Sequence, residues 1–283
     1  MKEGSEPGAR VDPDAYTEEY FRRGVEGHEE FAASGGRVLS PRLQRALTLA
    51  GLRASDRVLD IACGRGEVVL HGALRGAYAV GIDYAAAALN VARESLGGPG
   101  GGEMRTALAL MDAGRLAFRP GTFDVALMLD FVEHVYQPEL ERAFAEVRQA
   151  LKPGGRLIIH TSPNRVFEEV VYPRYVRNVH RVALGLGRRF KLDERFFNEL
   201  VLPTAATPPH DEYERRLHVN PQSAGTLRAA LARAGFAVRK VDHWEPPADA
   251  FFDETMRWHN IGLKALDAVR FLRPLSRVAP LHR

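Results

Sequence analysis

Between residues 57 and 161, short apolar runs alternate with longer amphipathic segments. Short apolar runs that end at polar or turn residues predict buried strands, whereas apolar positions every three or four residues predict helices. The predicted strands cover 57–62, 77–83, 104–110, 122–129 and 156–161, and the predicted helices between them cover 66–75, 85–96 and 138–151. This alternation predicts an α/β fold with a mostly parallel sheet and helices on both of its faces.

The first fifty residues precede this alternation. Residues 15–33 carry four aromatic side chains and predict one or two short helices. A longer helix over 41–50 is predicted by Ser40 as its capping residue, Pro41 in its first turn and Gly51 after its last turn.

Beyond residue 162 the pattern is interrupted and then resumes. Five prolines and short helical patterns between 163 and 219 indicate an inserted lid. Asn220 and Pro221 then predict the start of a helix that runs to Ala234, and a sixth strand is predicted at 236–244. The predicted divisions are a tail and helical cap (1–50), a core (51–162), the lid (163–219), a completion of the core (220–248) and an amphipathic C-terminal helix (249–283).

Composition narrows the function classes. The 283 residues carry 39 basic and 36 acidic side chains, a formal net charge of +3, and one cysteine, Cys63. A single cysteine excludes a disulfide framework and a cysteine-rich zinc site. There is no apolar run of about 18 residues, as a membrane-spanning helix would need, and the N-terminus has no apolar leader. We therefore expect a reduced, cytoplasmic compartment.

The clearest motif lies at residues 58–66, where a predicted strand ends in a loop of small residues before a helix. Gly64 and Gly66 allow a ligand to approach the backbone closely. A phosphate-binding loop would need a Gly-Lys-Ser/Thr sequence, which is absent, and a dinucleotide site would need glycine in place of Val69. The carboxylate of Asp60 suits a cationic nucleoside better than a pyrophosphate. A tight turn without a ligand is the remaining alternative.

The acidic strand end followed by a G-x-G loop resembles the first motif of the class I S-adenosylmethionine-dependent methyltransferases. Asp83, at the end of the second predicted strand, and the sequence Met-Asp-Ala at 111–113 resemble the next two motifs. Residues 116–124 and 151–155 are similar to the approach to the family's fourth strand and to the turn before its fifth. The resemblance extends over residues 50–245 and implies a Rossmann-like fold with S-adenosylmethionine as methyl donor.

The resemblance implies a role for each acid near the strand ends. Asp60 and neighbouring backbone groups would bind the ammonium end of the donor, Asp83 both ribose hydroxyls, and Asp112 the adenine amino group. The candidate cofactor-binding residues are Asp60, Ala62, Gly64, Gly66, Asp83, Tyr84, Asp112 and Ala113. Two alternatives from other classes stay open: a nicotinamide-dependent oxidoreductase built on the same type of sheet, and a donor-binding protein without catalysis.

After the fourth predicted strand, residues 130–134 (DFVEH) resemble the metal-assisted O-methyltransferases of ubiquinone biosynthesis. In those enzymes two acids and a histidine bind magnesium beside the accepting hydroxyl, which implies Asp130, Glu133 and His134 as metal ligands here. Asp130 replaces a more usual glutamate, and histidine is a less usual ligand for magnesium. Alternatively, His134 is a metal-free general base or has only a packing or capping role. The candidate catalytic residues are His134 and Asp130.

The predicted acceptor is a hydroxyl group of a small molecule or a glycan. Residues 160–165 (HTSPNR) resemble methyltransferases of glycan and lipid biosynthesis clusters. The Asn-Pro-Pro-Tyr or Asp-Pro-Pro-Tyr sequence of enzymes that methylate base amines is absent after the fourth predicted strand, so no nucleic-acid partner is expected. Methylation at carbon, nitrogen or a carboxyl group is the alternative.

Two segments leave further partners open. The arginine-rich segment 165–195 is either a solvated helix face or a lid that meets an anionic acceptor or an anionic membrane surface. The apolar stripe of 249–283 is a packing surface, a homodimer face or a peripheral membrane contact. His210 and His218, near the end of the predicted lid, either reach the acceptor site or are structural.

Overall fold

The structure is a computed structural model that describes residues 10–98, 104–162 and 216–241, with isolated residues between 165 and 189. Most of the predicted lid (163–219), the last residues of the predicted core completion (220–248) and all of the C-terminal helix (249–283) lie outside the described residues. The homodimer and membrane contacts expected of the C-terminal helix therefore stay predictions.

The contacts of the chain separate it into two units. The first comprises Met1–Ser162 with Glu212–Val238, and the second comprises Pro163–Asp211 with Arg239–Arg283. Nearly all described residues belong to the first unit. The fold and the site are accordingly those of the first unit.

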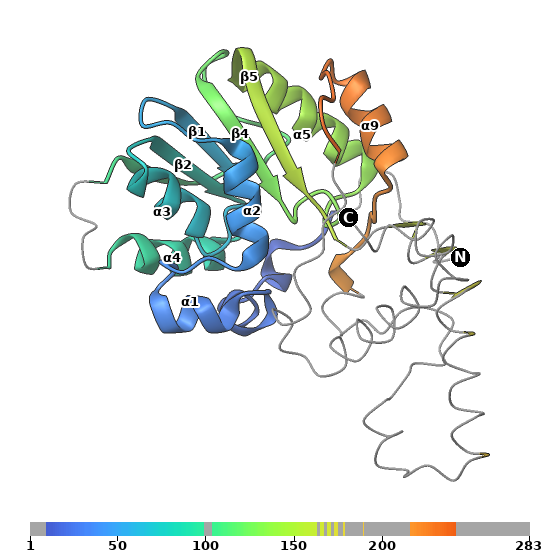
Figure 1. Ribbon diagram of the computed structural model, residues 1–283, viewed down its shortest axis with the longest axis horizontal. Helices are drawn as coiled ribbons and strands as arrows, with labels where there is room; N and C mark the ends of the chain where they lie inside the picture. Colours follow the sequence, from blue (N-terminus) through green and yellow to red (C-terminus); the bar gives the residue numbers. More distant parts are fainter. Residues whose placement is uncertain are drawn as a thin grey trace. The chain divides into compact units, whose positions relative to one another are not determined.

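The first unit is built on a five-stranded, wholly parallel sheet (Figure 1). Its strands are β1 (Arg57–Ile61), β2 (Tyr78–Asp83), β3 (Thr106–Leu110), β4 (Phe123–Leu129) and β5 (Leu151–His160). Their order across the sheet is β3-β2-β1-β4-β5, so the strand order reverses between β1 and β4. The predicted α/β fold with a parallel sheet is confirmed. In such sheets ligands bind outside the carboxyl ends of the strands at the point of reversal.

Apolar side chains of the central strands alternate between two helical layers. The helices are α2 (Pro41–Ala50), α3 (Glu67–Leu74), α4 (Ala86–Leu96), α5 (Gln137–Ala150) and α9 (Ala224–Arg233). Leu59 and Ile61 of β1 pack with α5 and α9, whereas Val58 packs with α2, α3 and α4. Because side chains alternate along a strand, Asp60 shares the face of Val58. β1 is buried on both faces from Val58 onward, as expected of a central parallel strand.

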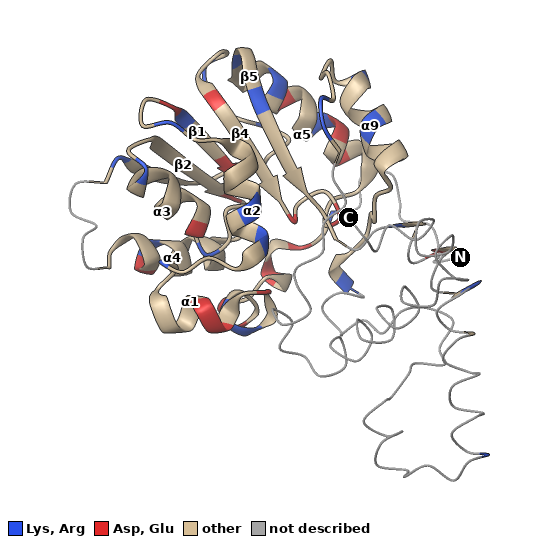
Figure 2. Ribbon diagram, viewed as in Figure 1, with Lys and Arg blue, Asp and Glu red and all other residues tan. Residues whose placement is uncertain are grey.

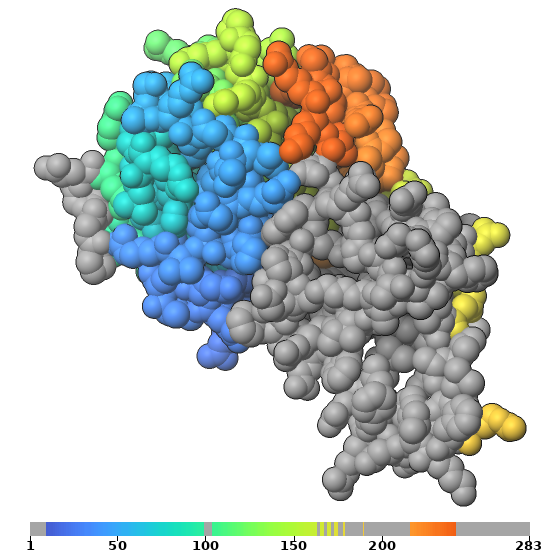
Figure 3. All heavy atoms as spheres, viewed as in Figure 1, coloured from blue at the N-terminus to red at the C-terminus, as the bar shows by residue number. Residues whose placement is uncertain are grey.

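The N-terminal residues form a cap against the α3 and α4 side of the core. We call residues 11–34 the N-terminal cap; it contains the short helices η1 (Pro13–Ala15), η2 (Tyr20–Gly24) and α1 (His28–Ser34). Tyr16, Phe21 and Phe31 are buried together with Ala88 and Val91 of α4. Figure 3 shows the dark-blue N-terminal residues packed directly against the cyan surface of the core. The short helices predicted over 15–33 are confirmed.

The helix predicted over 41–50 begins and ends where the sequence indicates. Ser40 Oγ accepts a hydrogen bond from the backbone N–H of Leu43 at 3.4 Å, with Pro41 in the first turn. Gly51 ends α2 with a φ of 54°, in the left-handed region that favours glycine. The bounds of this helix could be predicted from the sequence because each end is set by residues adjacent to it.

The fifth strand begins earlier than predicted. Residues 151–155 were expected to form a turn, but β5 already starts at Leu151 and pairs there with Phe123 of β4. The register shifts between Phe123 and Val125, and Gly154 has a φ of 78°. An irregular strand with a glycine kink therefore occupies the Lys-Pro-Gly-Gly sequence.

The segment after residue 220 also differs from the prediction. α9 begins at Ala224, capped by Ser223, whose Oγ accepts from the backbone N–H of Thr226 at 3.1 Å. Asn220 is instead engaged with the segment after β4, where its backbone N–H donates to the Glu133 carbonyl at 3.0 Å. No strand forms over 236–241, which is the described part of the predicted sixth strand.

The outer faces of the helices are charged (Figure 2). Between α5 and α9, Arg233 Nη2 donates to Glu141 Oε1 at 2.6 Å on the surface. Within the described ranges, no helix combines the length and the apolar character that a membrane span requires.

Candidate active site

A cavity of about 150 Å³ lies at the carboxyl ends of β1, β2 and β4, between the strand ends and the N-terminal cap. Its polar lining includes Asp60, Asp83, Asp112, Asp130, Arg10 and Arg42, and its aromatic lining includes Tyr16, Tyr20, Phe21 and Tyr84. Among the eight predicted cofactor-binding residues, all except Gly66 line this cavity. The sequence motifs therefore converge at the point where the strand order reverses.

The cavity floor is formed by the glycine loop, residues 62–66, which joins β1 to α3. Ala62 has a φ of 57°, and Gly64 and Gly66 have φ values of 49° and 77°. A left-handed backbone at alanine stores strain and is maintained only where the surroundings over-determine it. Gly66 has a packing role instead of lining the cavity, because a Cβ there would lie 2.9 Å from the Cβ of Ala92 on α4.

Two buried carboxylates face the loop. Asp60 is 4% exposed and Asp83 5% exposed. Burial, with a contribution from nearby Asp83, raises the pKa of Asp60 well above its usual range. Burial raises the pKa of Asp83 to about 6, although Asp83 Oδ1 and Oδ2 accept from the backbone N–H groups of Ala85 and Gly64 at 2.9 and 3.1 Å. Neither carboxylate has an ion-pair partner among the described residues, so a cationic ligand would find unneutralised charge here.

Asp112 occupies the end of the cavity beyond β3. Its Oδ1 accepts from the backbone N–H of Gly114 at 2.8 Å, and its Oδ2 lies 3.1 Å from Arg10 Nη1. The Arg10 guanidinium also lies over the ring of Tyr84, 4.9 Å from its centroid. Asp112 is therefore partly exposed and paired, unlike Asp60 and Asp83.

Aromatic rings from the N-terminal cap cover the cavity. The Tyr16 ring contacts Tyr84 and Tyr20 edge to face, with centroids 5.7 and 5.5 Å apart, and lies 6.3 Å from the Phe21 ring. Tyr16 and Phe21 are both buried and line the cavity. The same two rings therefore pack in the hydrophobic core and cover the site. The faces of such rings attract a cation that lies against them.

Asp130, directly after β4, is held by two long-range partners. Its carboxylate forms an ion pair with the buried Arg42 of α2, and its Oδ1 accepts from Nδ1 of His160 at 2.5 Å. The backbone N–H of Asp130 also donates to the His160 carbonyl at 3.0 Å, and Asp130 has a φ of 53°. Burial, with the charge of Arg42, lowers the pKa of His160 to about 4.

Glu133 and His134 have different partners from Asp130. Glu133 is 1% exposed; its Oε2 accepts from Thr161 Oγ1 at 2.9 Å and its Oε1 from the backbone N–H of Ser162 at 3.3 Å. Burial raises the pKa of Glu133 to about 7. His134 lines the cavity, and its Nδ1 is hydrogen-bonded to the Tyr16 hydroxyl at 3.2 Å. Burial, with the neighbouring His218, lowers the pKa of His134 to about 3.

The three predicted magnesium ligands do not converge within the described residues. The side chains that do converge are Glu133, His134 and His218, whose ligand atoms all lie within 4.8 Å of one another. Magnesium favours an octahedral shell of oxygen ligands. One carboxylate that already accepts two hydrogen bonds, together with two imidazoles, does not fit that preference. The residues present therefore do not support the predicted magnesium site. The carboxylate of Asp130 contacts Arg42 and His160 instead.

Sequence reasoning missed several residues of the site. Arg42 and Arg65 line the cavity although both are almost fully buried, and Glu67 lies beside them. No periodicity or motif marked these charges as buried. The only available signal was that Arg65 lies between the two glycines of the G-x-G loop.

Similarity to known proteins agrees with this geometry. The family profile described as "Methyltransferase domain" matches residues 59–159. A demethylmenaquinone methyltransferase of Thermus thermophilus is 34% identical over 201 residues, which are 69% of this chain and 81% of that protein. The chain belongs to the class I S-adenosylmethionine-dependent methyltransferases. Its methyl donor is therefore S-adenosylmethionine, and the nicotinamide-dependent alternative is set aside.

Other relatives of this methyltransferase are named for different acceptors. A ubiquinone biosynthesis O-methyltransferase of Marinobacter nauticus is 33% identical over 48% of this chain and 56% of its own length. An 18S rRNA (guanine-N(7))-methyltransferase of Schizosaccharomyces pombe is 32% identical over 42% of this chain and 46% of its own length. The chain thus spans about half the length of these two relatives.

The fold of the methyltransferase also matches solved structures. YcgJ of Bacillus subtilis aligns with a TM-score of 0.51 over 83% of this chain and 87% of that chain, at 19% identity. At that identity the likeness extends to the fold alone.

Proposed function

We propose that this enzyme transfers a methyl group from S-adenosylmethionine to a hydroxyl group of a small-molecule or sugar acceptor, in the cavity beneath the N-terminal cap. The observation that carries the proposal is that carboxylates at the carboxyl ends of β1, β2 and β3 line one cavity together with Asp130 and His134. The donor would lie along the first three, which leaves its methyl group toward the last two.

The chemistry of the donor suits the lining in that orientation. Its ammonium group would lie near Asp60, its ribose hydroxyls would donate to Asp83, and its adenine amino group would compete with Arg10 for Asp112. The methionyl carboxylate needs a cation, and Arg42 is the buried guanidinium that lines the cavity on the β4 side. The rings of Tyr16 and Phe21 would cover the sulfonium region.

Methyl transfer requires an acceptor oxygen in line with the breaking carbon–sulfur bond. The oxygen forms a bond to the methyl carbon, the electron pair of the carbon–sulfur bond goes to sulfur, and the acceptor proton must go to a base. The enzyme contributes mainly by holding the two reactants in that geometry. S-adenosylhomocysteine, with a neutral thioether, leaves as product.

His134 is the proposed proton acceptor. Its low pKa keeps the imidazole unprotonated near pH 7 but also makes it a weak base, so it takes the proton only as the oxygen–methyl bond forms and the hydroxyl becomes acidic. Burial also raises the pKa of the Tyr16 phenol, which therefore stays protonated and can accept a hydrogen bond from Nδ1–H of His134. That tautomer leaves Nε2 free to take the acceptor proton. Asp130, whose carboxylate is engaged by Arg42 and His160, would orient the acceptor side of the cavity instead of taking the proton.

The acceptor class is inferred from the relatives and from the methyl end of the cavity. The hydroxyl acceptor is favoured by the named ubiquinone biosynthesis O-methyltransferase and by a neutral histidine beside the methyl end. Methylation at carbon, nitrogen or a carboxyl group remains the alternative. The rRNA methyltransferase among the relatives makes RNA the competing substrate class. If the acceptor is anionic, the arginines of the segment 165–195 are candidates to bind it, as the sequence predicts.

A direct test is a methyl-transfer assay with isotopically labelled S-adenosylmethionine. The acceptor panel contains hydroquinones, catechols, sugar nucleotides, carboxylic acids and a structured RNA. We expect label in an alkali-stable ether of a hydroxyl acceptor. Label that enters only RNA, a carboxyl ester or a carbon atom would overturn the O-methylation proposal while it leaves the donor site intact.

A further inference from the structure

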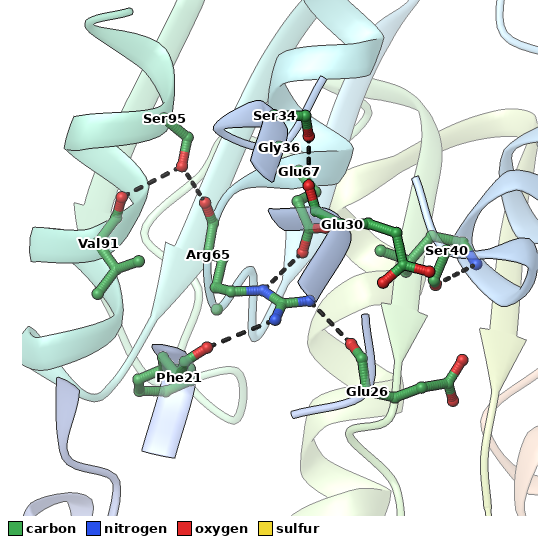
Figure 4. Close-up of polar contacts among 12 residues, drawn as sticks. Phe21, Glu26, Glu30, Ser34, Gly36, Ser40, Arg65, Glu67, Val91 and Ser95 are labelled. Atoms are coloured by element: carbon green, nitrogen blue, oxygen red, sulfur yellow. Dashed lines mark hydrogen bonds and ion pairs between the residues drawn. The ribbon is translucent and has the colours of Figure 1, made fainter. Parts of the chain in front are cut away.

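Arg65 belongs to two structures at once. Its backbone is part of the glycine loop, between Gly64 and Gly66, and its guanidinium extends into the N-terminal cap (Figure 4). The residue is 3% exposed. The proposed donor contacts described above do not use this side chain.

Each part of the Arg65 guanidinium has a partner. Nε donates to Glu67 Oε2 at 2.8 Å, Nη2 to the backbone carbonyl of Glu26 at 2.9 Å, and Nη1 to the backbone carbonyl of Phe21 at 3.5 Å. The guanidinium carbon lies 4.8 Å from the centroid of the Phe31 ring. A planar fork of donors can satisfy these directions together, whereas a lysine ammonium cannot. Arg65 is thereby fixed to three residues of the cap.

The backbone of Arg65 is fixed as firmly as its side chain. Its carbonyl accepts from Ser95 Oγ of α4 at 2.6 Å, and the same hydroxyl contacts the Val91 carbonyl at 3.2 Å (Figure 4). The next residue, Gly66, packs against Ala92 of α4. A movement of the glycine loop therefore cannot be absorbed locally and would be transmitted along the Arg65 side chain.

The other polar contacts between the cap and α4 are at the surface. Arg22 Nη2 lies 2.7 Å from Glu94 Oε1, with side chains 37% and 60% exposed. Asn90 Nδ2 donates to Glu18 Oε1 at 3.0 Å, also in an exposed position. Exposed pairs of this kind contribute little to stability. Two buried cations contact the cap as well: Arg42, whose Nε lies 3.0 Å from Glu26 Oε2, and Arg65. A buried cation would lose its cap partners if the cap opened, which is a much larger cost, and of the two only Arg65 belongs to the glycine loop.

The cap lies directly over the glycine loop. A Cβ added to Gly64 would be 3.6 Å from Cε1 of Phe21. Phe21 and Tyr16 also line the cavity. A donor in the cavity would thus contact the loop on one side and the cap on the other.

We propose that Arg65 is a positioning residue that couples binding of the methyl donor to closure of the N-terminal cap. The inference rests on the proposed donor site. When the donor binds, it holds the glycine loop still, and Arg65 then holds the Phe21 and Glu26 carbonyls of the cap in place. In the other direction, a closed cap holds Arg65 and therefore keeps the loop in its binding conformation. Such coupling is reciprocal: whatever the donor does to the cap, the cap does to donor affinity.

The test compares Arg65→Lys with Arg22→Gln, which breaks only exposed ion pairs, those of Arg22 with Glu94 and Glu18. S-adenosylhomocysteine is titrated calorimetrically into each variant, and hydrogen exchange of residues 11–34 is measured with and without it. In the wild type, the ligand should slow exchange in the cap. Arg65→Lys should bind roughly 5- to 150-fold more weakly, with faster cap exchange that recovers at saturating ligand. Arg22→Gln should match the wild type in both measurements.

Exchange in β1 and β4 reports whether Arg65→Lys still folds. If it does not, Glu67→Gln, which removes only the charge of the Nε partner, should show the same effects at smaller size. Wild-type affinity in a folded Arg65→Lys protein, or cap exchange in the wild type that ligand leaves unchanged, would overturn the inference. Failure of the wild type itself to bind S-adenosylhomocysteine would instead reject the proposed donor site, and the coupling with it.

Discussion

The two halves of the cavity are built differently. On the donor half, Asp60 and Asp83 are the penultimate residue of β1 and the last residue of β2, and their orientation is set by strand and loop backbone. On the acceptor half, each polar side chain is held by a partner distant in sequence, as Asp130 is by Arg42 and His134 by Tyr16. The donor half is thus preorganised by local structure, and the acceptor half by the assembled tertiary fold.

This difference explains why one fold accommodates many acceptors. The donor is the same molecule for the whole family, so a backbone scaffold suffices to bind it. The acceptor varies between relatives, and long-range side-chain contacts can be exchanged without rebuilding the sheet. We therefore expect substitutions on the two halves to affect different measured quantities.

The largest effect is expected on the acceptor half. Replacing His134 with alanine removes the proposed proton acceptor and should lower kcat roughly 100- to 10,000-fold. Donor affinity should stay within a few-fold of wild type, because His134 touches the methyl end only. Single-turnover rates and a donor titration on the same preparation separate the two quantities. If the variant retains full kcat, His134 is not the proton acceptor and only packs against His218.

On the donor half, Asp83→Ala should weaken binding of S-adenosylmethionine roughly 10- to 100-fold, since hydrogen bonds to a charged group contribute about 1.5–3 kcal/mol each. Asp124→Ala is the matched control, because Asp124 is paired with Lys152 and is absent from the cavity lining. Calorimetry should show no change in donor affinity for that control. Equal losses in both variants would point to general destabilisation.

Gly66 allows a test of how tightly the glycine loop is packed. Gly66→Ala introduces a Cβ 2.9 Å from Ala92 in a left-handed backbone, and overpacking of this kind costs about 1–3 kcal/mol. Gly121→Ala is the control: its φ is 66°, but nothing lies within 4 Å of the new Cβ. Urea unfolding should show a clearly larger loss for Gly66→Ala. Equal losses would mean that backbone conformation alone matters at Gly66.

The smallest predicted effect is a pH dependence of donor binding. Burial raises the pKa of Asp83 to about 6, so below that pH the free enzyme holds a proton that the ribose contact must displace. Donor affinity should therefore rise with pH, by at most about tenfold per unit below pH 6, and level off above it. The same shift makes ionised Asp83 destabilising, so the fold loses stability as pH rises between about 4 and 6. Asp83→Asn should remove the pH dependence of donor affinity and reduce that of stability, to which the raised pKa values of Asp60 and Glu133 also contribute.

The donor half of the cavity could be predicted from the sequence, whereas most of the acceptor half could not. Asp60, Asp83 and Asp112 could be found from sequence because each lies at the carboxyl end of a strand whose apolar run is easily recognised. The strand ends then meet at one edge of the sheet for reasons of topology. The α2 helix was equally predictable, since Ser40 and Gly51 act through adjacent backbone.

The acceptor half could not be derived in this way. Residues 130–134 were identified as a motif, but the partner of each side chain lies 28 or more positions away along the chain. Nothing in a linear pattern pairs Asp130 with Arg42, so the metal-ligand interpretation grouped Asp130 with Glu133 and His134, which converge with His218 instead. Of the predicted sixth strand (236–244), the described residues 236–241 form no strand, and their apolar pattern alone did not indicate this.

The central claim is that the cavity between the N-terminal cap and the strand ends binds the methyl donor. A crystal structure with S-adenosylhomocysteine tests it most directly. We predict ribose hydroxyls hydrogen-bonded to Asp83, adenine beside Asp112 and Ala113, and the sulfur directed toward Asp130 and His134. A ligand with its ribose away from Asp83, or bound outside this cavity, would contradict the account.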